Sequence, residues 1–348
     1  MVTIKDIARE AGVSFTTVSN VIHGNYGHVS QATVQRVRAV MERMQYVPNM
    51  SARGLVSRSS RLIALAYGHD DRSERTMLED AFASTLVGAV EREVRARKYY
   101  LLLTAVQDPD DLVQLLNTWN VDGLLAFGLS PKGAQVLRQN TQKPLVFIDG
   151  VFLPGEESQC INVGLEDRAA GAEMTEYLLA RGHRQIAFCC GPAQDLESLG
   201  PTRERMLGWE AALRRAGIEP QADWRIALGQ PRQERRLQEQ ALLSRLEEFT
   251  ALFIANDMLA AEVQNFLLDR GVQIPARLSI AGFDGSEYAS LVRPSITTMR
   301  QDVREKGALA VRQLLACMQS GTPEQRQIRL ACHLVEGAST AQVPAVRV

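Results

Sequence analysis

Two groups of polar residues in this sequence have types and positions suited to molecular recognition. The first group lies where apolar runs end: Asp149 follows LVFI, Asn256 and Asp257 follow LFIA, and Asp284 follows SIAGF. Short carboxylate and amide side chains at such positions can hydrogen-bond the hydroxyl groups of a sugar-like ligand. Arg205, in the run RERMLGWEAAL, is placed to join them. The alternative for each Asp or Asn is an ordinary helix cap.

The second group lies in the stretch VSFTTVSNVIH, from Val13 to His23. At helical spacing, Val18, Val21 and Ile22 face inward. The side chains that remain outside are those of Phe15, Thr16, Ser19, Asn20 and His23. An exposed aromatic and small polar face is suited to base edges and thymine methyl groups in the major groove of DNA.

The charge distribution supports a DNA partner for this N-terminal end. Residues 1–61 have a net charge of about +5, and the rest of the chain carries about −6, in a protein whose formal net charge is −1. A basic segment on an acidic body is what binding to phosphates requires. The partner we expect is double-stranded DNA.

Short helices must position the DNA-reading residues. Thr3 can cap a first helix with Asp6 as its reciprocal partner, Gly12 can end it, and Ser14 can cap the second helix. Ser30 can cap a third. The expected buried faces are Ile4, Ile7, Ala8 and Ala11 in the first helix and Val34, Val37, Met41 and Met44 in the third. Two helices joined by a tight glycine turn indicate a helix-turn-helix, although a small helical bundle is the alternative.

The remainder of the chain alternates apolar runs with amphipathic stretches, which predicts α/β architecture with parallel sheets covered on both faces. The pattern restarts near Ile161, so we expect two lobes with a cleft between them. Predicted strands are 62–67, 99–104, 121–127, 145–148, 161–163, 186–190, 224–228, 252–255, 278–283, 296–299 and one late strand at 329–335. Predicted helices are 81–97, 112–119, 131–140, 166–181, 202–216, 233–248, 258–270 and 303–319.

Length and composition limit the class of protein. A chain of 348 residues has room for two or three domains, and no apolar run approaches a membrane span. The N-terminus lacks the pattern of a secretory signal, so we expect no export. Five irregularly spaced cysteines argue against a disulfide framework, and Cys189 and Cys190 are expected to be buried in a strand. The scattered histidines predict no metal site, and we expect no cofactor.

The N-terminal motifs resemble those of a known family. IKDIAREAGVSFTTVSNVIHG, then VS, a helix, YVPNMSARGL and a Ser/Arg joint, is similar to the headpiece of the lac repressor (LacI/GalR) family of bacterial transcription regulators. The resemblance implies that Phe15, Thr16 and Asn20 read bases. Many relatives have Arg at the position of Asn20, and Arg favours guanine where Asn favours adenine. The DNA-binding residues expected in the headpiece are Thr3, Ser14, Phe15, Thr16, Thr17, Ser19, Asn20 and His23.

The segment that follows resembles the hinge helix of this family, which folds only on DNA. About seven residues are too few to form a stable helix alone in water. The resemblance implies that Leu55 inserts into the central base step from the minor groove and kinks the duplex, with Ala52 packed beside it. Asn49 and Arg53 are assigned to the same contact. The alternative for Leu55 is an ordinary core leucine.

The body also resembles this family. ALFIANDMLA, LSIAGFDGSEYASL, RPSITTMRQD and RERMLGWEAAL are similar to its effector-binding body, which looks like periplasmic sugar-binding proteins. The resemblance implies that Asp149, Arg205, Asn256 and Asp284 hold the effector and that Phe82 stacks on it, while Asp257 is structural. The expected domains are a headpiece at 1–48, a hinge at 49–60 and a two-lobed body at 61–348.

Two departures from the family bear on the effector. Relatives often carry an Asn-Pro-aromatic-aromatic segment after the first strand. This chain has HDDRSERTMLEDAF there, and Phe82 is the one aromatic residue in it. Relatives also often have an aromatic after the strand near Leu228, where this chain has GQPRQ. Fewer stacking rings and more charge indicate a polar or anionic effector, such as a phosphorylated sugar.

Three functions compete at this point. An α/β enzyme lacks its motifs here, because neither G-x-G-x-x-G, nor G-x-x-x-x-G-K-[ST], nor a nucleophile elbow is present. A plain sugar-binding protein leaves the basic headpiece unexplained. The sequence therefore predicts a non-enzymatic, effector-controlled transcriptional repressor that binds operator DNA as a homodimer. We expect it in the bacterial cytoplasm, associated with the nucleoid, with no membrane partner.

Overall fold

The computed structural model describes residues 2–46, 59–68, 76–107, 109–229, 232–321 and 325–343. The chain forms two compact units, Met1–Ser60 and Arg61–Val348, each with its own core. The predicted hinge helix lies outside the described residues, and so do the four DNA-binding residues assigned to it, Asn49, Ala52, Arg53 and Leu55.

The first unit contains three α-helices and a single short 3-10 turn in its described part. They are α1 (Ile4–Ala11), α2 (Phe15–His23), η1 (Tyr26–His28) and α3 (Gln31–Arg43). Thr3 and Asp6 form the predicted capping box of α1, and Gly12 ends this helix with a φ of 63°. Because glycine adopts a left-handed backbone conformation without steric strain, the chain turns sharply there into α2. Ser14 and Ser30 cap α2 and α3 as expected.

The core of this unit follows the predicted helical periodicity, except that Ile4, Ile22 and two residues of α3 are only partly buried. Ile7 and Val18 are fully buried where α1 and α2 meet. In α3 the buried residues are Val34, Val37 and Val40, whereas Met41 and Met44 pack only partly against the core. After Val37 the prediction took a four-residue step to Met41, whereas the buried face continues with a three-residue step to Val40. A helical period of 3.6 residues is compatible with either step.

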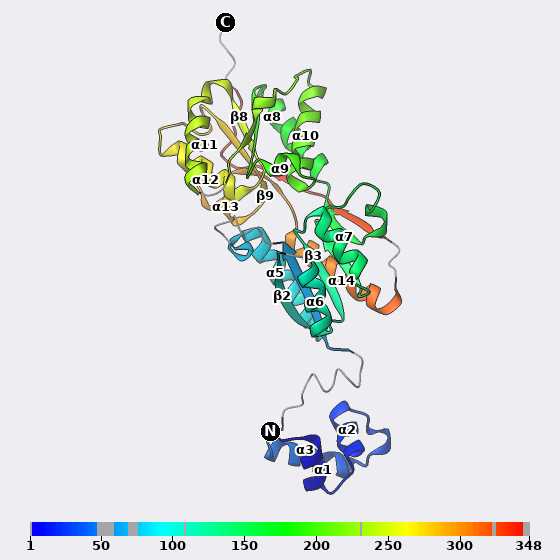
Figure 1. The fold of residues 1–348 in the computed structure, drawn as a ribbon. Coiled ribbons are helices and arrows are strands. Elements are labelled where there is room, and N and C mark those ends of the chain that lie inside the picture. The colour runs from blue at the N-terminus through cyan, green and yellow to red at the C-terminus, as the bar shows by residue number, and fades with distance from the viewer. Residues whose placement is uncertain are drawn as a thin grey trace. The chain divides into compact units, whose positions relative to one another are not determined.

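The first lobe of the second unit is a sheet with helices on both faces (Figure 1). Its described strands form a six-stranded parallel sheet. In spatial order they are β11 (Gln327–Leu330), β5 (Asn162–Leu165), β4 (Leu145–Ile148), β3 (Gly123–Phe127), β1 (Leu62–Gly68) and β2 (Tyr100–Val106). A short 3-10 turn, η3 (Glu157–Gln159), precedes β5.

The two faces of this sheet are covered by different helix pairs. Alternate strand residues such as Leu65 and Leu125 pack under α5 (Ala81–Ala96), which follows η2 (Met77–Glu79), and α14 (Val303–Ser320). The intervening residues, such as Ala66 and Leu124, pack under α6 (Pro109–Trp119) and α7 (Pro131–Asn140). The period-2 alternation of a strand therefore builds two cores from one run of apolar residues.

The second lobe repeats this plan. Its described strands also form a six-stranded sheet: β12 (His333–Val335), β10 (Thr297–Arg300), β9 (Ser279–Asp284), β8 (Ala251–Ile254), β6 (Ile186–Cys190) and β7 (Arg225–Ala227). One face packs on α8 (Asp167–Ala180) and α10 (Pro201–Arg215), with the short α9 (Gln194–Glu197) alongside. The other packs on α11 (Arg232–Ser244), α12 (Asp257–Leu268) and α13 (Glu287–Leu291), with η4 (Ala222–Trp224) and η5 (Leu246–Glu248) at its margin.

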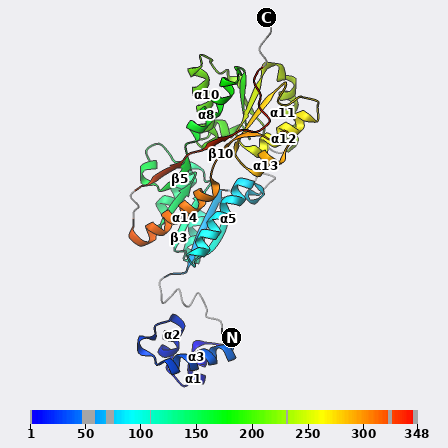
Figure 2. The same ribbon diagram turned by 180° about the vertical axis from the view of Figure 1, so that it is seen from behind.

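Three chain crossings connect the lobes in the described body, and they correct the predicted division (Figure 2). The strand predicted to restart the pattern, β5, belongs to the first sheet, and the second lobe begins only with α8. Helix α14 returns to the first lobe. The single late strand predicted at 329–335 is wrong, because β11 joins the first sheet while β12 pairs antiparallel with β10 in the second.

Three further expectations can be compared with the structure. No helix in the described segments has both the length and the apolar character needed to cross a membrane. All five cysteines are free and buried, and burial raises the pKa of the Cys189 thiol in β6. Among the residues that the structure describes, no cluster of three or more His, Cys, Asp or Glu is arranged to hold a metal ion.

Candidate DNA-binding surface and effector cleft

Helix α2 presents the residues predicted to read DNA. Phe15 is 52% exposed, which is unusual for an aromatic side chain, and Thr16 beside it is exposed as well. Ser19 and Asn20 are half-buried rather than fully outside. An exposed phenyl ring at the first turn has no stabilising role in the headpiece core, so its position favours contact with a partner.

The hydroxyl groups at the helix starts have structural partners within the headpiece. Thr3 Oγ1 donates to Asp6 Oδ2 at 2.7 Å. Ser14 Oγ accepts from the backbone N–H of Thr17 at 3.1 Å and lies 2.9 Å from Thr17 Oγ1. Capping therefore accounts for the positions of these three residues, and their contact with DNA remains a prediction. His23 closes α2, and the structure does not describe its side chain.

Between the two lobes, buried polar side chains form a continuous chain of contacts. Lys306 Nζ, from α14 of the first lobe, donates to Asp149 at 2.7 Å and 2.9 Å and to Gln301 Oε1 at 2.8 Å. Gln301 Nε2 in turn donates to Asp284 Oδ1 of the second lobe at 2.7 Å. Gln301 lies in the crossing between β10 and α14, so one crossing segment joins a carboxylate of each lobe.

Arg205 extends this network within the second lobe. Its Nε donates to Asp167 Oδ1 at 2.9 Å, its Nη1 donates to the carbonyl of Ala255 at 2.7 Å, and Nη1 lies 3.6 Å from Asp284 Oδ1. The guanidinium also lies over the Phe283 ring, 3.5 Å from its centre. Because the side chain is only 9% exposed, these contacts replace the water that it would otherwise bind.

Two glycines allow Arg205 to reach this position. A Cβ added to Gly171 of α8 would lie 2.3 Å from the carbonyl oxygen of Arg205, and one added to Gly208 of α10 would lie 2.1 Å from that of Arg168. Neither position can hold a side chain without moving backbone. The resulting close approach of α8 and α10 places Arg205 against Asp167 at the start of α8.

Burial changes the acidity of the aspartates in this network. It raises the pKa of the Asp284 carboxyl to about 7, against the opposing effect of Arg205. Burial also raises the pKa of Asp149, although Lys306 favours its charged form. Both residues have left-handed backbone, with φ of 48° at Asp149 and 107° at Asp284. Strained backbone and desolvated carboxylates at two strand ends are typical of a binding site.

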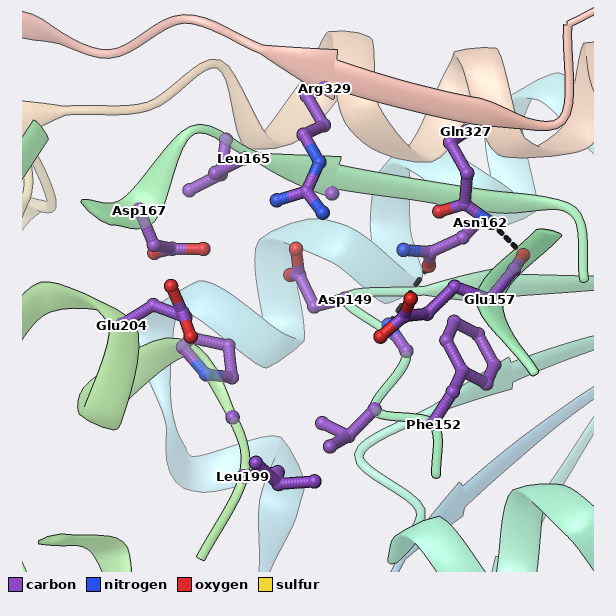
Figure 3. Close-up of a pocket in the computed structure, with 15 residues that line it drawn as sticks. Asp149, Phe152, Glu157, Asn162, Leu165, Asp167, Leu199, Glu204, Gln327 and Arg329 are labelled. Atoms are coloured by element: carbon purple, nitrogen blue, oxygen red, sulfur yellow. Dashed lines mark hydrogen bonds between the residues drawn. The ribbon is translucent and has the colours of Figure 1, made fainter. Parts of the chain in front are cut away.

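Two hollows open beside this network, and they divide the predicted effector residues. Asp149 lines a cavity of about 200 Å³ between the lobes (Figure 3). Phe82 and Asp284 line a larger hollow of about 1300 Å³. Arg205 and Asn256 are not among the lining residues of either hollow. The structure thus brings Asp149, Arg205 and Asp284 into one network without placing all five predicted residues around one cavity.

Two of the strand-end predictions, and the predicted stacking residue Phe82, can be compared with their contacts. Asn256 caps α12, with Oδ1 accepting from the N–H of Leu259 at 2.8 Å, so the capping alternative accounts for its position. Asp257 is fully buried and bonds Thr298 and the N–H of Ser286, as expected of a structural residue. The Phe82 ring lies 5.2 Å from Lys306 Nζ, and it remains only a candidate stacking residue.

Reasoning from the sequence missed Lys306, Gln301 and Asp167. Lys306 did leave a signal: it lies at i−4 from Ala310 on the buried face of α14, where the other buried residues are apolar or glycine. A lone lysine on a buried helical face requires an ionic partner. Its partner, Asp149, is 157 residues away in the sequence, and only the fold identifies it.

Comparisons with known proteins agree with this architecture. The model for bacterial regulatory proteins of the lacI family matches residues 3–49, and the model for a periplasmic binding protein-like domain matches residues 175–340. The HTH-type transcriptional regulator GalR of Escherichia coli K12 is 31% identical over 310 residues, covering 87% of this chain and 85% of GalR. The ribose operon repressor of the same organism is 29% identical, covering 97% of this chain and all of the relative.

Solved structures extend the likeness to the whole fold. The lac repressor dimer bound to operator and the anti-inducer ONPF is 27% identical, with a TM-score of 0.81, covering 98% of this chain and 99% of the repressor. The transcriptional regulator CelR in complex with cellobiose is 25% identical, with a TM-score of 0.72 and coverage of 97% and 100%. These relatives are regulators rather than enzymes. The chain with the exposed recognition helix and the two-lobed body belongs to the lacI family of bacterial regulatory proteins.

Proposed function

We propose that this protein is a sequence-specific transcriptional repressor whose affinity for operator DNA is set by a small hydroxyl-rich effector bound between the lobes. The observation that carries the proposal is the buried network from Asp149 through Lys306 and Gln301 to Asp284. It joins carboxylates of both lobes, so a ligand that competes for either one changes how the lobes contact each other.

The effector acts through these shared contacts. Asp149 and Asp284 have acceptor capacity beyond their bonds to Lys306 and Gln301, and hydroxyl groups can donate to it. A ligand bound to one lobe arrangement more tightly than to another shifts the population of arrangements. By linkage, operator DNA changes effector affinity by the same factor that effector changes DNA affinity.

We infer that two copies of the chain bind one operator. A single helix-turn-helix reads a half-site, and a near-palindromic operator matches a two-fold dimer. The body has large apolar side chains that remain exposed, among them Tyr100 at 60% and Leu291 at 71%. The lac repressor relative is a dimer on its operator. We place the dimer in the bacterial cytoplasm, on nucleoid DNA.

The DNA contacts that we assign remain those of the headpiece and hinge. Phe15, Thr16 and Asn20 read bases in the major groove, and Leu55 opens the central step from the minor groove. We assign no catalytic step to the cleft, because its buried aspartates are held by Lys306 and Arg205 rather than left to accept a substrate proton.

The test begins with selection of duplex DNA from a random library, followed by fluorescence anisotropy across a salt series. We expect a near-palindromic sequence whose affinity falls steeply with salt. Phe15→Ala should weaken operator binding at least about tenfold, the loss of a base contact. Gln35→Ala, exposed on α3, is the matched control and should leave binding unchanged. Lack of any sequence-preferring binding to duplexes, with or without sugars present, would refute the proposal.

A further inference from the structure

Three of the four carboxylates that line the smaller cavity are paired with neighbouring cations; the fourth, Glu157, has no ion pair among the described residues. Asp149 is paired with Lys306 at 2.7 Å, Asp167 with Arg205 at 2.9 Å, and Glu204 with Arg168 at 2.8 Å. These side chains offer oxygen acceptors to the cavity while adding little net negative charge. Their natural partners are hydroxyl groups, which donate hydrogen bonds without bringing a charge.

One cation lines this cavity without such a partner. Arg329 of β11 makes no ion pair or hydrogen bond with any residue in the described part of the chain. Figure 3 shows its guanidinium extending from the strand into the cavity, between Asn162 and Asp167. Its register partner on β5 is Gly164, whose missing side chain leaves this space open.

Asn162 supplies a second donor on the same wall. It is only 8% exposed, and its Oδ1 accepts from the N–H of Gly150 at 2.9 Å. Its Nδ2 bonds no described residue, and it lies 3.6 Å from the point where a Cβ of Gly164 would be, as does Asp149 Oδ1. The wall therefore presents a guanidinium and an amide N–H₂, both donors, opposite the aspartate acceptors. An anionic group placed at this wall can accept from both donors.

The occupant that fits has an anionic end and a hydroxyl-rich remainder. A planar guanidinium matches a carboxylate through two parallel hydrogen bonds. A phosphate would bring about −1.5 to −2 charges, more than one arginine neutralises, close to Asp149 and Asp167. The cavity of about 200 Å³ corresponds to the volume of roughly seven water molecules, which suits a compound of monosaccharide size.

We propose that Arg329, assisted by the Nδ2 of Asn162, binds the carboxylate of a sugar acid whose hydroxyl groups donate to Asp149 and Asp167. This assignment rests on the proposed function, since it names the chemical class of the effector in the same cleft. Arg329, which would recognise the charge, lies in β11. This is the last strand of the first lobe before the chain crosses to the second lobe.

Calorimetry on the full-length protein tests the assignment with matched pairs of compounds. The pairs are D-gluconate with D-glucitol, D-glucuronate with D-glucose, and D-galacturonate with D-galactose; glucose 6-phosphate and inorganic phosphate are added. We expect at least one acid to bind tenfold or more tightly than its neutral partner and than either phosphate. Arg329→Gln should remove that preference and leave the neutral compound's affinity unchanged.

Arg326→Gln provides the matched control. It removes the same charge from the same segment, but Arg326 bonds the carbonyls of Ser158 and Gln159 and does not line the cavity. It should keep the full preference for the acid. Thermal unfolding of both variants checks that neither loses its fold.

The contrary results are equally distinct. Binding of acid and neutral compound with equal affinity, binding of no acid, or tighter binding of glucose 6-phosphate would each overturn the assignment of a carboxylate to Arg329. Equal losses for acid and neutral compound in Arg329→Gln would do the same. None of these results removes the proposed function, which depends on duplex binding measured separately by anisotropy.

Discussion

The recognition surface of α2 and the cleft between the lobes are built in opposite ways. The surface comes from nine consecutive residues, and the first of them, Phe15, is half exposed. The cleft network joins Asp149 to Lys306, both nearly or fully buried and charged. The exposed Phe15 side chain needs no partner within the headpiece, whereas each buried charge of the cleft network needs an opposite charge.

This difference determines what a substitution does. On α2, a change of an exposed side chain should alter DNA binding and leave the free energy of unfolding unchanged. In the cleft, a change should affect stability and effector binding together, because removal of one partner leaves a buried charge uncompensated. The following variants test that contrast from the largest effect to the smallest.

Lys306→Met should cause the largest loss of stability. Lys306 is completely buried, and its removal leaves the carboxylate of Asp149 without its cation. We expect the free energy of unfolding of the body to fall by about 3–5 kcal/mol in urea denaturation. The double variant Lys306→Met with Asp149→Asn should recover part of this loss. If the single and double variants were equally unstable, the loss would come from packing rather than charge.

Asp284→Asn should separate the two functions of the protein. The amide oxygen can still accept from Gln301, so the loop keeps its bond, while the charge facing Arg205 is lost. Asp284 does not line the smaller cavity, so we expect effector affinity to fall indirectly, through the contacts of Gln301 and Lys306 that lead to Asp149. Operator binding without effector should be unchanged in anisotropy. Unaltered effector affinity would remove Asp284 from the site.

Asn20→Arg should change which bases the headpiece prefers. Asn pairs with adenine and Arg with guanine, and each good contact contributes about 1–3 kcal/mol of discrimination. Repeating the duplex selection with this variant should return a different base at one position in each half-site, with the melting temperature preserved. An identical selected sequence would show that Asn20 does not read a base.

The pH dependence of stability should report on the cleft and not on α2. Burial raises the pKa of Asp284 to about 7 from the ordinary 3.8, so its folded form holds a proton that the unfolded chain has released. The stability due to Asp284 is therefore complete below about pH 4 and is lost as pH rises to about 7. The gap in unfolding free energy between Asp284→Asn and wild type should widen by about 1 kcal/mol per pH unit over that range. A constant gap would contradict this assignment.

Ser14→Ala should have the smallest effect, and it tests the boundary between structure and recognition on α2. Loss of the cap to the N–H of Thr17 should destabilise the headpiece by about 1 kcal/mol. Ser14→Asp keeps a capping oxygen but adds a negative charge, so it should restore stability and weaken DNA binding. Equal DNA binding by both variants would show that Ser14 acts only as a cap.

Much of the fold follows from local patterns in the sequence. The capping box of Thr3 and Asp6, the turn at Gly12 and the strand Leu145–Ile148 all appear where they were predicted. Each depends on residues within a few positions of each other, so no knowledge of distant contacts is needed. The late strand was predicted wrongly as one piece, since no local pattern shows that residues 327–330 and 333–335 belong to different sheets.

The sequence by itself therefore determined the helical headpiece, its exposed reading face, the α/β alternation of the body and the candidate aspartates at strand ends. Only the tertiary structure decided that Asn256 is a cap, that Lys306 neutralises Asp149, and that Arg329 faces the cavity unpaired. The physical reason is the range of the interaction. Helix caps and strand alternation act between near neighbours, whereas buried ion pairs join groups that come together only after the chain has crossed between the lobes.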